Sequence, residues 1–494
     1  MLLKKREKKD KIESKNKITM NKNIQLIPFL TLAAASVNAQ QSQPNILFIT
    51  ADDLGYESLG YNGNSTPNIS PNIDRLASES MQFHCAFVTA SISQPSRSSW
   101  ITGRYPHHNG TVGFNPISNE NPMLGKEMRR GGYYTALYGK GTHFAPITEE
   151  HWDDCVPHVT GSGRNATEFE KLLVRSMNES EKRHQPFFII ANCADPHRPF
   201  YGTPKDIKNV PKPSRVYTPN EVDVPGYLMD IPETRNELAH YYSSVKRLDD
   251  IVGRMLHVVD SLGKRENTII IFASDNGAAI PFAKGSCYLQ SHKTPLLIRY
   301  PGKPALVDTT HFICGIDIMP TILDMAHADS VQGMDGYSFY PLLQGKSQPE
   351  RDHVNVVYHR EHFMPTEQRA YHDKKWGYIY NEWRAWEYER KINFVADNNV
   401  GIFGCAQADS VRQRKEFYLR RAPEELYDYE QDPFALHNLV DDPRCQEILS
   451  DMRTKMKDWM EFTCDYCCSG YNIYLSTLKE QNKKSNLKYK NCHE

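Results

Sequence analysis

The sequence predicts an α/β fold, in which helices sandwich a large, mixed but mostly parallel sheet and a smaller C-terminal α+β domain follows. Two observations predict this fold. From about residue 45, short apolar runs alternate with segments of helical periodicity, as in chains that build a parallel sheet. Polar residues of unusual type directly follow four of these apolar runs, as expected where parallel strands end at a functional edge.

Each predicted strand is a continuous apolar run of the kind that is buried on both faces of a sheet. A helix is expected to begin at Ser70 and Pro71, which supply a cap and a first-turn proline. A longer helix is expected where apolar residues recur at helical spacing from Leu238 to Val259, and Gly263 ends it. The predicted strands are residues 45–50, 134–138, 187–191, 268–272 and 295–299.

The chain has 494 residues, more than one hydrophobic core usually serves. We expect a leader and signal peptide over 1–39, because an apolar stretch between Ile24 and Ala35 precedes the cleavage pattern Val37-Asn38-Ala39. The protein is therefore predicted to be exported, to the periplasm or outside the cell. A polar stretch after Gly345 divides a larger domain, 40–347, from an α+β domain, 348–478, and a polar tail, 479–494.

Composition narrows the classes of function. Hydrophobic residues make up 39% and charged residues 24%, as in soluble globular proteins. No apolar run approaches the roughly 20 residues that span a bilayer, so we expect no stable membrane insertion. The net charge of −1 falls to about −7 without the leader, and no basic cluster suggests nucleic acid as a partner. The eleven scattered cysteines suggest one or two disulfides after export.

Four polar clusters follow four predicted strands, and they are expected to meet in one cleft beyond the carboxyl ends of the sheet. Carboxylate and amide oxygens from two of these clusters suit Ca²⁺ or Mg²⁺, and the absence of a His or Cys cluster argues against zinc. The four clusters are Asp52-Asp53, Lys140 to His143, Asp195-Pro-His197 and Asp275-Asn276-Gly277.

The segment Ser91-Ile-Ser93-Gln-Pro95-Ser96-Arg97, followed by Thr102-Gly103-Arg104, resembles the signature of type I sulfatases. In that family the first signature residue, here Ser93, is oxidised to formylglycine, and the hydrated aldehyde is the nucleophile. A position before a helix N-terminus also offers backbone N–H donors to sulfate oxygens. Serine at this position implies a serine-type formylglycine-generating maturase as a partner.

The same resemblance implies an alkaline-phosphatase-like fold and roles for the other clusters. One Ca²⁺ ion is expected on Asp52, Asp53, Asp275, Asn276 and the modified Ser93. Arg97 is expected to hold the aldehyde hydrate, Lys140 to stabilise the nucleophile, and Lys284 to bind sulfate. His197 is expected to protonate the leaving group, and His143 to act as the later base. Lys140 and His143 are one residue further apart than the family usually has them.

Within the family, the chain resembles the branch that removes the N-sulfate of glucosamine in heparin and heparan sulfate, the heparan sulfamidases. This resemblance rests on Asp52-Asp-Leu-Gly-Tyr-Glu-Ser, His107-His-Asn-Gly110, Asp195-Pro-His-Arg198 and Ser274-Asp-Asn-Gly277. The substrate is thus expected to be a sulfated saccharide. His359, Arg360, Glu361 and His362 are candidates from the second domain for lining its pocket.

Three alternatives stay open at this stage. The first is an O-sulfatase that acts on a glycosaminoglycan or mucin sugar with the same site and a different pocket. The second is a metal-dependent phosphohydrolase that uses an unmodified Ser or Thr, usually with zinc. The third is a protein that binds sulfated glycans without catalysis, in which Ser93 is never modified.

Overall fold

The computed structural model describes residues 43–359, 366–385 and 409–491. The predicted leader and signal peptide lie outside the described residues, as do Arg360, Glu361 and His362. Among the described residues, no helix is both long and apolar enough to cross a membrane.

The core of the larger part of the chain is an eight-stranded sheet, which contains all five predicted strands. The strand order is β5-β4-β6-β1-β7-β8-β2-β9. The four central strands β4, β6, β1 and β7 run parallel to one another, whereas β8 is antiparallel to both β7 and β2. The bounds are β1 Asn45–Asp52, β2 Met81–Phe83, β4 Tyr134–Tyr138, β5 Asp154–Val156, β6 Phe187–Pro196, β7 Thr268–Ser274, β8 Leu296–Arg299 and β9 Leu306–Asp308.

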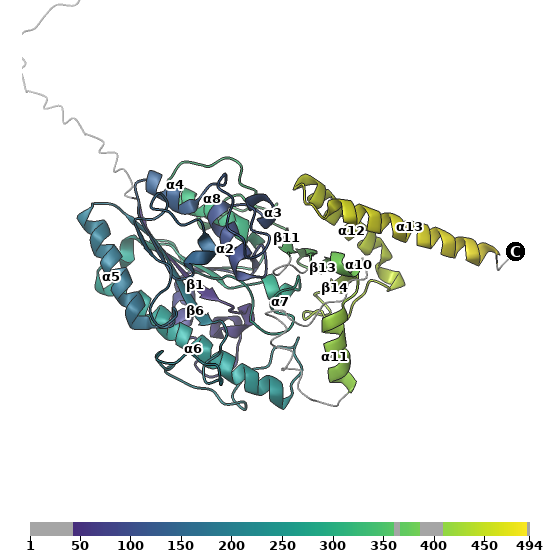
Figure 1. Cartoon of the computed structure of the whole chain (residues 1–494), viewed down its shortest axis with the longest axis horizontal. Coiled ribbons are helices and arrows are strands. Elements are labelled where there is room, and N and C mark those ends of the chain that lie inside the picture. Colours follow the sequence, from purple (N-terminus) through teal and green to yellow (C-terminus); the bar gives the residue numbers. More distant parts are fainter. Residues whose placement is uncertain (1–42, 360–365, 386–408, 492–494) are drawn as a thin grey trace, which may run out of the picture. The chain divides into compact units, whose positions relative to one another are not determined.

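Helices cover both faces of this sheet, which explains why its central strands are apolar throughout (Figure 1). Side chains alternate along a strand, so β1 buries Leu47 and Ile49 in one core and Ile46 and Phe48 in the other. The first core includes α1 (Pro71–Ser78), α5 (Ala166–Lys182) and α6 (Pro232–Ser261). The second includes α2 (Ser93–Thr102), α4 (Leu124–Arg130) and α8 (Ile318–Met325).

A second, antiparallel sheet of four strands follows, in the order β11-β12-β13-β14. Its strands are β11 His353–Tyr358, β12 Gln368–Asp373, β13 Trp376–Asn381 and β14 Glu424–Asp428. Helix α12 (Gln446–Phe462) packs Met452 and Met456 against Tyr378 and Leu426 of this sheet, and α13 (Cys468–Asn491) contains most of the predicted polar tail. The two parts meet where Val357 of β11 forms a bridge with Ala90.

Short elements complete the fold and connect the layers. They are β3 Ala86–Phe87, β10 Ile313–Cys314, α3 Pro106–Asn109, α7 Leu289–His292, α9 Tyr340–Leu343, α10 Glu382–Ala385 and α11 Asp409–Arg420.

The expectation of one or two disulfides is wrong for the described part of the chain. Nine cysteines lie there and all nine are free. Cys193, Cys287 and Cys314 are buried in different elements of the fold, so scattered positions in the sequence correspond to scattered positions in space. Even Cys464, Cys467 and Cys468, which are neighbours in the sequence, remain thiols.

Candidate active site

The four polar clusters lie at the carboxyl ends of β4, β6, β1 and β7. Since these strands are adjacent and parallel, their carboxyl ends share one edge of the sheet. The chain reverses sharply there, and Asp53 and Lys140 adopt positive φ angles of 67° and 54°. Gly277 has to be glycine, because a Cβ atom would lie 2.2 Å from the carbonyl oxygen of Gln290.

Three buried carboxylates form the centre of the site. Carboxylate oxygens of Asp52, Asp53 and Asp275 lie within 4.8 Å of one another, and all three side chains are fully buried. Asn276 adds an amide group, whose nitrogen donates to Asp53 over 2.8 Å. The second oxygen of Asp53 accepts no hydrogen bond from a described residue. Hard oxygens grouped in this way fit a divalent cation of the Ca²⁺ type.

Ser93 is the first residue of α2, and its hydroxyl faces the carboxylates. The Oγ atom lies 3.2 Å from an oxygen of Asp52 and 3.4 Å from the amide oxygen of Asn276. All ten residues of α2 are buried, so the positive end of the helix dipole points at this position inside the protein. Ser93 is therefore placed where an anionic group would be stabilised.

Arg97, one turn along α2, anchors the cluster from behind. Its Nε donates to Asp275 over 2.9 Å, and its Nη1 donates to Thr50 and Asn192 over 2.9 and 2.6 Å. Its other described contacts go to the carbonyl oxygen of Ala51, to Asp52 and to the ring of Trp100, rather than to Ser93. Arg97 thus fixes the carboxylates, and its predicted contact with the nucleophile stays a prediction.

Two lysines reach the carboxylates from opposite sides. Lys140 forms an ion pair with Asp52, and Lys284 with Asp53. Lys284 is buried, and although burial favours its neutral form, Asp53 and Asp52 raise its pKa. These carboxylates therefore favour the charged form of the Lys284 ammonium group.

Burial and neighbouring charges shift the pKa values of Asp275 and Asp52 in opposite directions. Burial raises the pKa of Asp275 to about 7; Arg97 opposes this, and Asp52 and Asp53 add to it. Burial would also raise the pKa of Asp52, but Lys140, His197 and Arg97 hold it well below its usual value. Three carboxylates therefore lie here against three cationic side chains, Arg97, Lys140 and Lys284.

His197 and His143 lie beside the lysines and line a cavity of about 390 Å³ that opens next to the cluster. His197 Nε2 lies 3.8 Å from Asp53, and burial lowers the pKa of His197 although Asp53 and Asp52 oppose this. Burial, followed by Lys140 and Arg97, also lowers the pKa of His143 well below its usual value. The cavity is therefore next to two imidazoles whose pKa values burial lowers.

A buried network that sequence reasoning missed holds His197 in place. Asp195 accepts hydrogen bonds from Arg164 Nε over 3.1 Å and from Arg247 Nε over 2.6 Å. Arg164 also donates through Nη2 to the carbonyl oxygen of His197 over 2.8 Å. Asn192, the partner of Arg97, was missed as well, although a polar residue inside an apolar strand run was a usable signal.

The structure brings most of the sequence-predicted site residues to this one edge of the sheet. Of the candidates from the second domain, only His359 is described, and it is buried at the end of β11 beside Tyr466. The residues that converge are Asp52, Asp53, Ser93, Arg97, Lys140, His143, His197, Asp275, Asn276 and Lys284.

Two family models match this chain. One, described as Sulfatase, matches residues 44–328, and the other, described as N-sulphoglucosamine sulphohydrolase, C-terminal, matches residues 279–400. The first covers more than half of the chain and includes every residue of the candidate site.

Similar proteins include N-sulphoglucosamine sulphohydrolase of Homo sapiens, which is 29% identical over 487 residues and matches 88% of this chain and 94% of its own. An ulvan-active sulfatase of Formosa agariphila is 26% identical over 470 residues and matches 85% of this chain and 75% of its own. A solved structure of a protein with its substrate D-glucosamine-2-N,6-O-disulfate aligns at 17% identity and a TM-score of 0.65, over 86% of this chain and 99% of that one. At this identity the likeness concerns the fold alone.

Proposed function

Since the chain belongs to the sulfatase family and is a hydrolase, we propose that it removes the N-sulfate group from glucosamine units of heparin or heparan sulfate. The observation that carries this substrate is the match of residues 279–400 to the C-terminal model of N-sulphoglucosamine sulphohydrolase, since these residues lie largely beyond the general sulfatase match. The similarity to the human enzyme over 88% of the chain supports the same substrate.

One calcium ion is proposed at the carboxylate cluster. Asp52, Asp53, Asp275 and Asn276 would hold it together with the modified side chain of residue 93. One buried oxygen of Asp53 accepts no hydrogen bond within the part of the chain that the structure describes, which supports a further ligand there. When bound, the ion would withdraw negative charge from the sulfate oxygens.

The nucleophile is proposed to be formylglycine, made from Ser93 by a serine-type maturase that removes two electrons and two protons from the side chain. The hydrated aldehyde then carries two hydroxyl groups at the N-terminus of α2. Lys140 and Lys284 hold the sulfate through charge, and the backbone N–H groups at the start of the helix donate to its oxygens.

Proton transfers are assigned to Asp275 and the two imidazoles. One hydroxyl of the hydrate gives its proton to Asp275 and attacks sulfur while the S–N bond to glucosamine breaks. His197, in its protonated form, donates a proton to the leaving nitrogen; such an acid contributes about 10²–10⁴-fold. The second hydroxyl then loses its proton to His143, the bond from carbon to the sulfate oxygen breaks, and the aldehyde forms again. Arg164 helps to hold His197 in place, because it donates a hydrogen bond to the backbone carbonyl oxygen of His197.

The test is sulfate release from N-sulfoglucosamine and from glucosamine 6-O-sulfate, with enzyme co-expressed with a serine-type maturase and supplied with Ca²⁺. Release from the N-sulfated sugar alone supports the proposal. Release from the O-sulfated sugar alone moves the protein to the O-sulfatases. If neither sugar releases sulfate, although the mass of the peptide that contains residue 93 verifies formylglycine, N-sulfoglucosamine is rejected as the substrate.

Export is proposed on the basis of the sequence, because residues 1–39 carry the pattern of a cleaved signal peptide. The mature protein should be recovered from the periplasm or the medium with an N-terminus at Gln40. A chain that stays in the cytoplasm with residues 1–39 attached contradicts export.

A further inference from the structure

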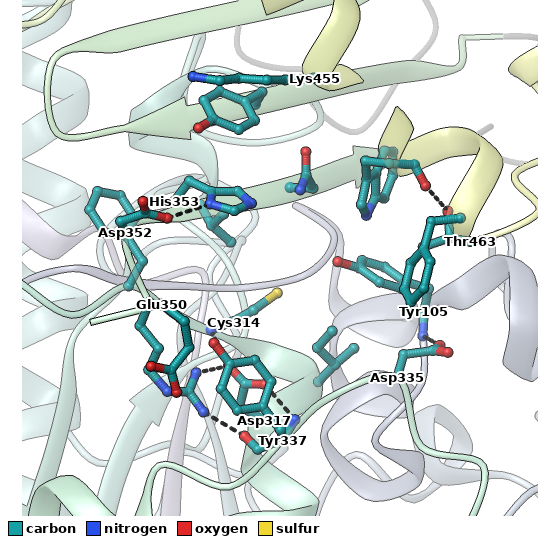
Figure 2. A pocket seen from close by; sticks show the side chains of 18 of the residues that line it. Tyr105, Cys314, Asp317, Asp335, Tyr337, Glu350, Asp352, His353, Lys455 and Thr463 are labelled. Atoms are coloured by element: carbon teal, nitrogen blue, oxygen red, sulfur yellow. Dashed lines mark hydrogen bonds and ion pairs between the residues drawn. The ribbon is translucent and has the colours of Figure 1, made fainter. Parts of the chain in front are cut away.

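A second cavity, of about 780 Å³, lies between the larger part of the chain and the small antiparallel sheet (Figure 2). We call it the lateral groove. Tyr105 and the segment 312–317 line one side, and Tyr371 and the end of α12 line the other. None of its lining residues belongs to the catalytic cluster. Binding sites are common at such junctions between two cores.

The lateral groove is separate from the nucleophile but connected to it by one strand. The groove includes His353 and Asn355 at the start of β11, whereas Val357 near the end of this strand bridges to Ala90, three residues before Ser93. Among the described residues, the groove and the catalytic cavity share no lining residue. A ligand in the groove therefore leaves the catalytic cavity free.

Aromatic side chains provide the apolar surface of the lateral groove. The rings of Tyr105 and Trp459 meet edge to face with centroids 5.5 Å apart, and those of His353 and Tyr371 stack at 4.9 Å. Phe462, at the end of α12, is 88% exposed. Flat rings that are apolar on their faces and polar at one end suit ligands that have the same mixed character, such as a sugar ring.

Asn355 supplies an unused polar group inside this apolar surface. Its side chain is only 7% exposed, and its amide oxygen has no hydrogen-bond partner in the described part of the chain. A buried amide without partners costs free energy, and a ligand hydroxyl group, which both donates and accepts, relieves this cost.

The charges of the lateral groove oppose a sulfated ligand. The inner carboxylates are already paired, since Asp317 contacts Arg351 and Asp335 contacts His108, each over 2.7 Å. At the rim, Glu350 and Asp458 are exposed and form no ion pair with a described residue. Lys455 also lines the groove, but it pairs with Asp451 over 3.0 Å, so the rim keeps an excess of negative charge, which repels anions.

We propose that the lateral groove binds a sugar unit that carries no sulfate, so that the enzyme holds an unsulfated part of a glycan while it acts on a sulfated one. That the ligand is a saccharide rests on the proposed function. The charges at the rim of the groove are the reason to exclude a sulfated ligand. The aromatic rings and Asn355 are the reason to expect affinity for a neutral sugar.

The test measures binding by saturation-transfer NMR and calorimetry, with the inactive Ser93→Ala protein and the disaccharide of N-acetylglucosamine as the neutral probe. We expect a dissociation constant of about 1 mM or lower. Phe462→Ala and Asn355→Leu should each weaken this binding about tenfold. In otherwise wild-type enzyme, neither substitution should change kcat/KM for N-sulfoglucosamine. Ile473→Ala, which removes an apolar side chain that is 56% exposed outside the groove, is the control.

Two outcomes overturn the proposal: no binding of the neutral disaccharide, and binding that neither groove variant weakens. A dimer that forms with rising concentration and is lost in Phe462→Ala also overturns it, because the lateral groove is then an interface between two copies. Failure of the proposed function looks different, since the neutral disaccharide still binds while no sulfate is released from either sulfated sugar.

Discussion

Two buried groups of charges in this protein differ in how completely they are paired. Under the small sheet, Arg369 and Asp465 form a one-to-one pair, with Nε 2.5 Å from one carboxylate oxygen and Nη2 2.9 Å from the other. At the edge of the large sheet, three carboxylates share their cations within 4.8 Å of one another. Both groups are almost fully buried, so burial alone does not distinguish them.

The two groups differ in whether the carboxylates can still bind a further cation. Burial would raise the pKa of Asp465, but Arg369 lowers it, so the pair is satisfied within the protein. Burial and its two neighbouring carboxylates instead raise the pKa of Asp275 to about 7. We therefore expect the Arg369–Asp465 pair to affect mainly the stability of the fold. The three-carboxylate cluster, in contrast, is expected to bind a ligand such as a metal ion.

The largest effect should come from Ser93→Ala. Loss of the side chain that becomes the nucleophile should lower kcat/KM by about 10³-fold or more, because no other hydroxyl lies at this position. Sulfate release measures the loss, and thermal unfolding should stay within a few degrees of the wild type. Ser99→Ala, on the same buried helix, is the matched control. If Ser93→Ala were as active as the wild type, Ser93 would be rejected as the nucleophile.

Next, Asp465→Asn should reduce the free energy of unfolding by about 3–5 kcal/mol, since the Arg369 charge is left buried without its partner. Denaturant unfolding measures the change, which should be the same with and without Ca²⁺. At a temperature where the variant stays folded, kcat should be close to that of the wild type. A selective loss of kcat would show that the Arg369–Asp465 pair takes part in catalysis.

Calcium should stabilise the wild type by about 2.7 kcal/mol at a concentration one hundred times its dissociation constant. Asp53→Asn should abolish this gain, because it removes one of the charged oxygen ligands from the cluster. Unfolding with calcium or with a chelator measures both proteins, and Asp458→Asn, an exposed acidic residue, is the control. An undiminished gain in Asp53→Asn would place the ion elsewhere.

Arg164→Lys should lower kcat about 10²-fold with little change in KM, because lysine cannot bridge Asp195 and the carbonyl of His197 at once. A variant that only destabilises the fold would instead lose folded protein and keep its kcat per folded molecule. Circular dichroism and active-site counting separate the two. Unchanged kcat would show that His197 needs no such support.

The smallest effect concerns His108 and Asp335, a pair that is partly exposed. The hydrogen bond that His108 donates to Asp335 raises the pKa of His108 above its usual 6.5. The stability that this pair contributes to the fold is therefore fully present below pH 6.5. It is lost as the pH rises through the raised pKa of His108. Unfolding of wild type and His108→Gln should differ by about 0.5–1 kcal/mol at low pH and converge at high pH. A constant difference at every pH would reject the linkage.

Much of the large sheet could be predicted from the sequence, since strands covered on both faces require continuous apolar runs such as residues 45–50 and 134–138. The antiparallel direction of β8 could not, because an apolar run carries no information about the direction of its neighbours. The predicted disulfides failed for a related reason. Spacing along the chain does not show which cysteines are neighbours in space.

The sequence by itself determined the family and the chemical groups at four strand ends, because a motif such as Ser93 to Arg104 and its acidic partners are local features of the chain. Only the tertiary structure decided what holds these groups in place. Arg97 meets Asn192 across 95 residues, and Arg164 meets His197 across 33. The lateral groove likewise joins Asn355 to Phe462. Such contacts depend on how layers pack, and no local pattern encodes them.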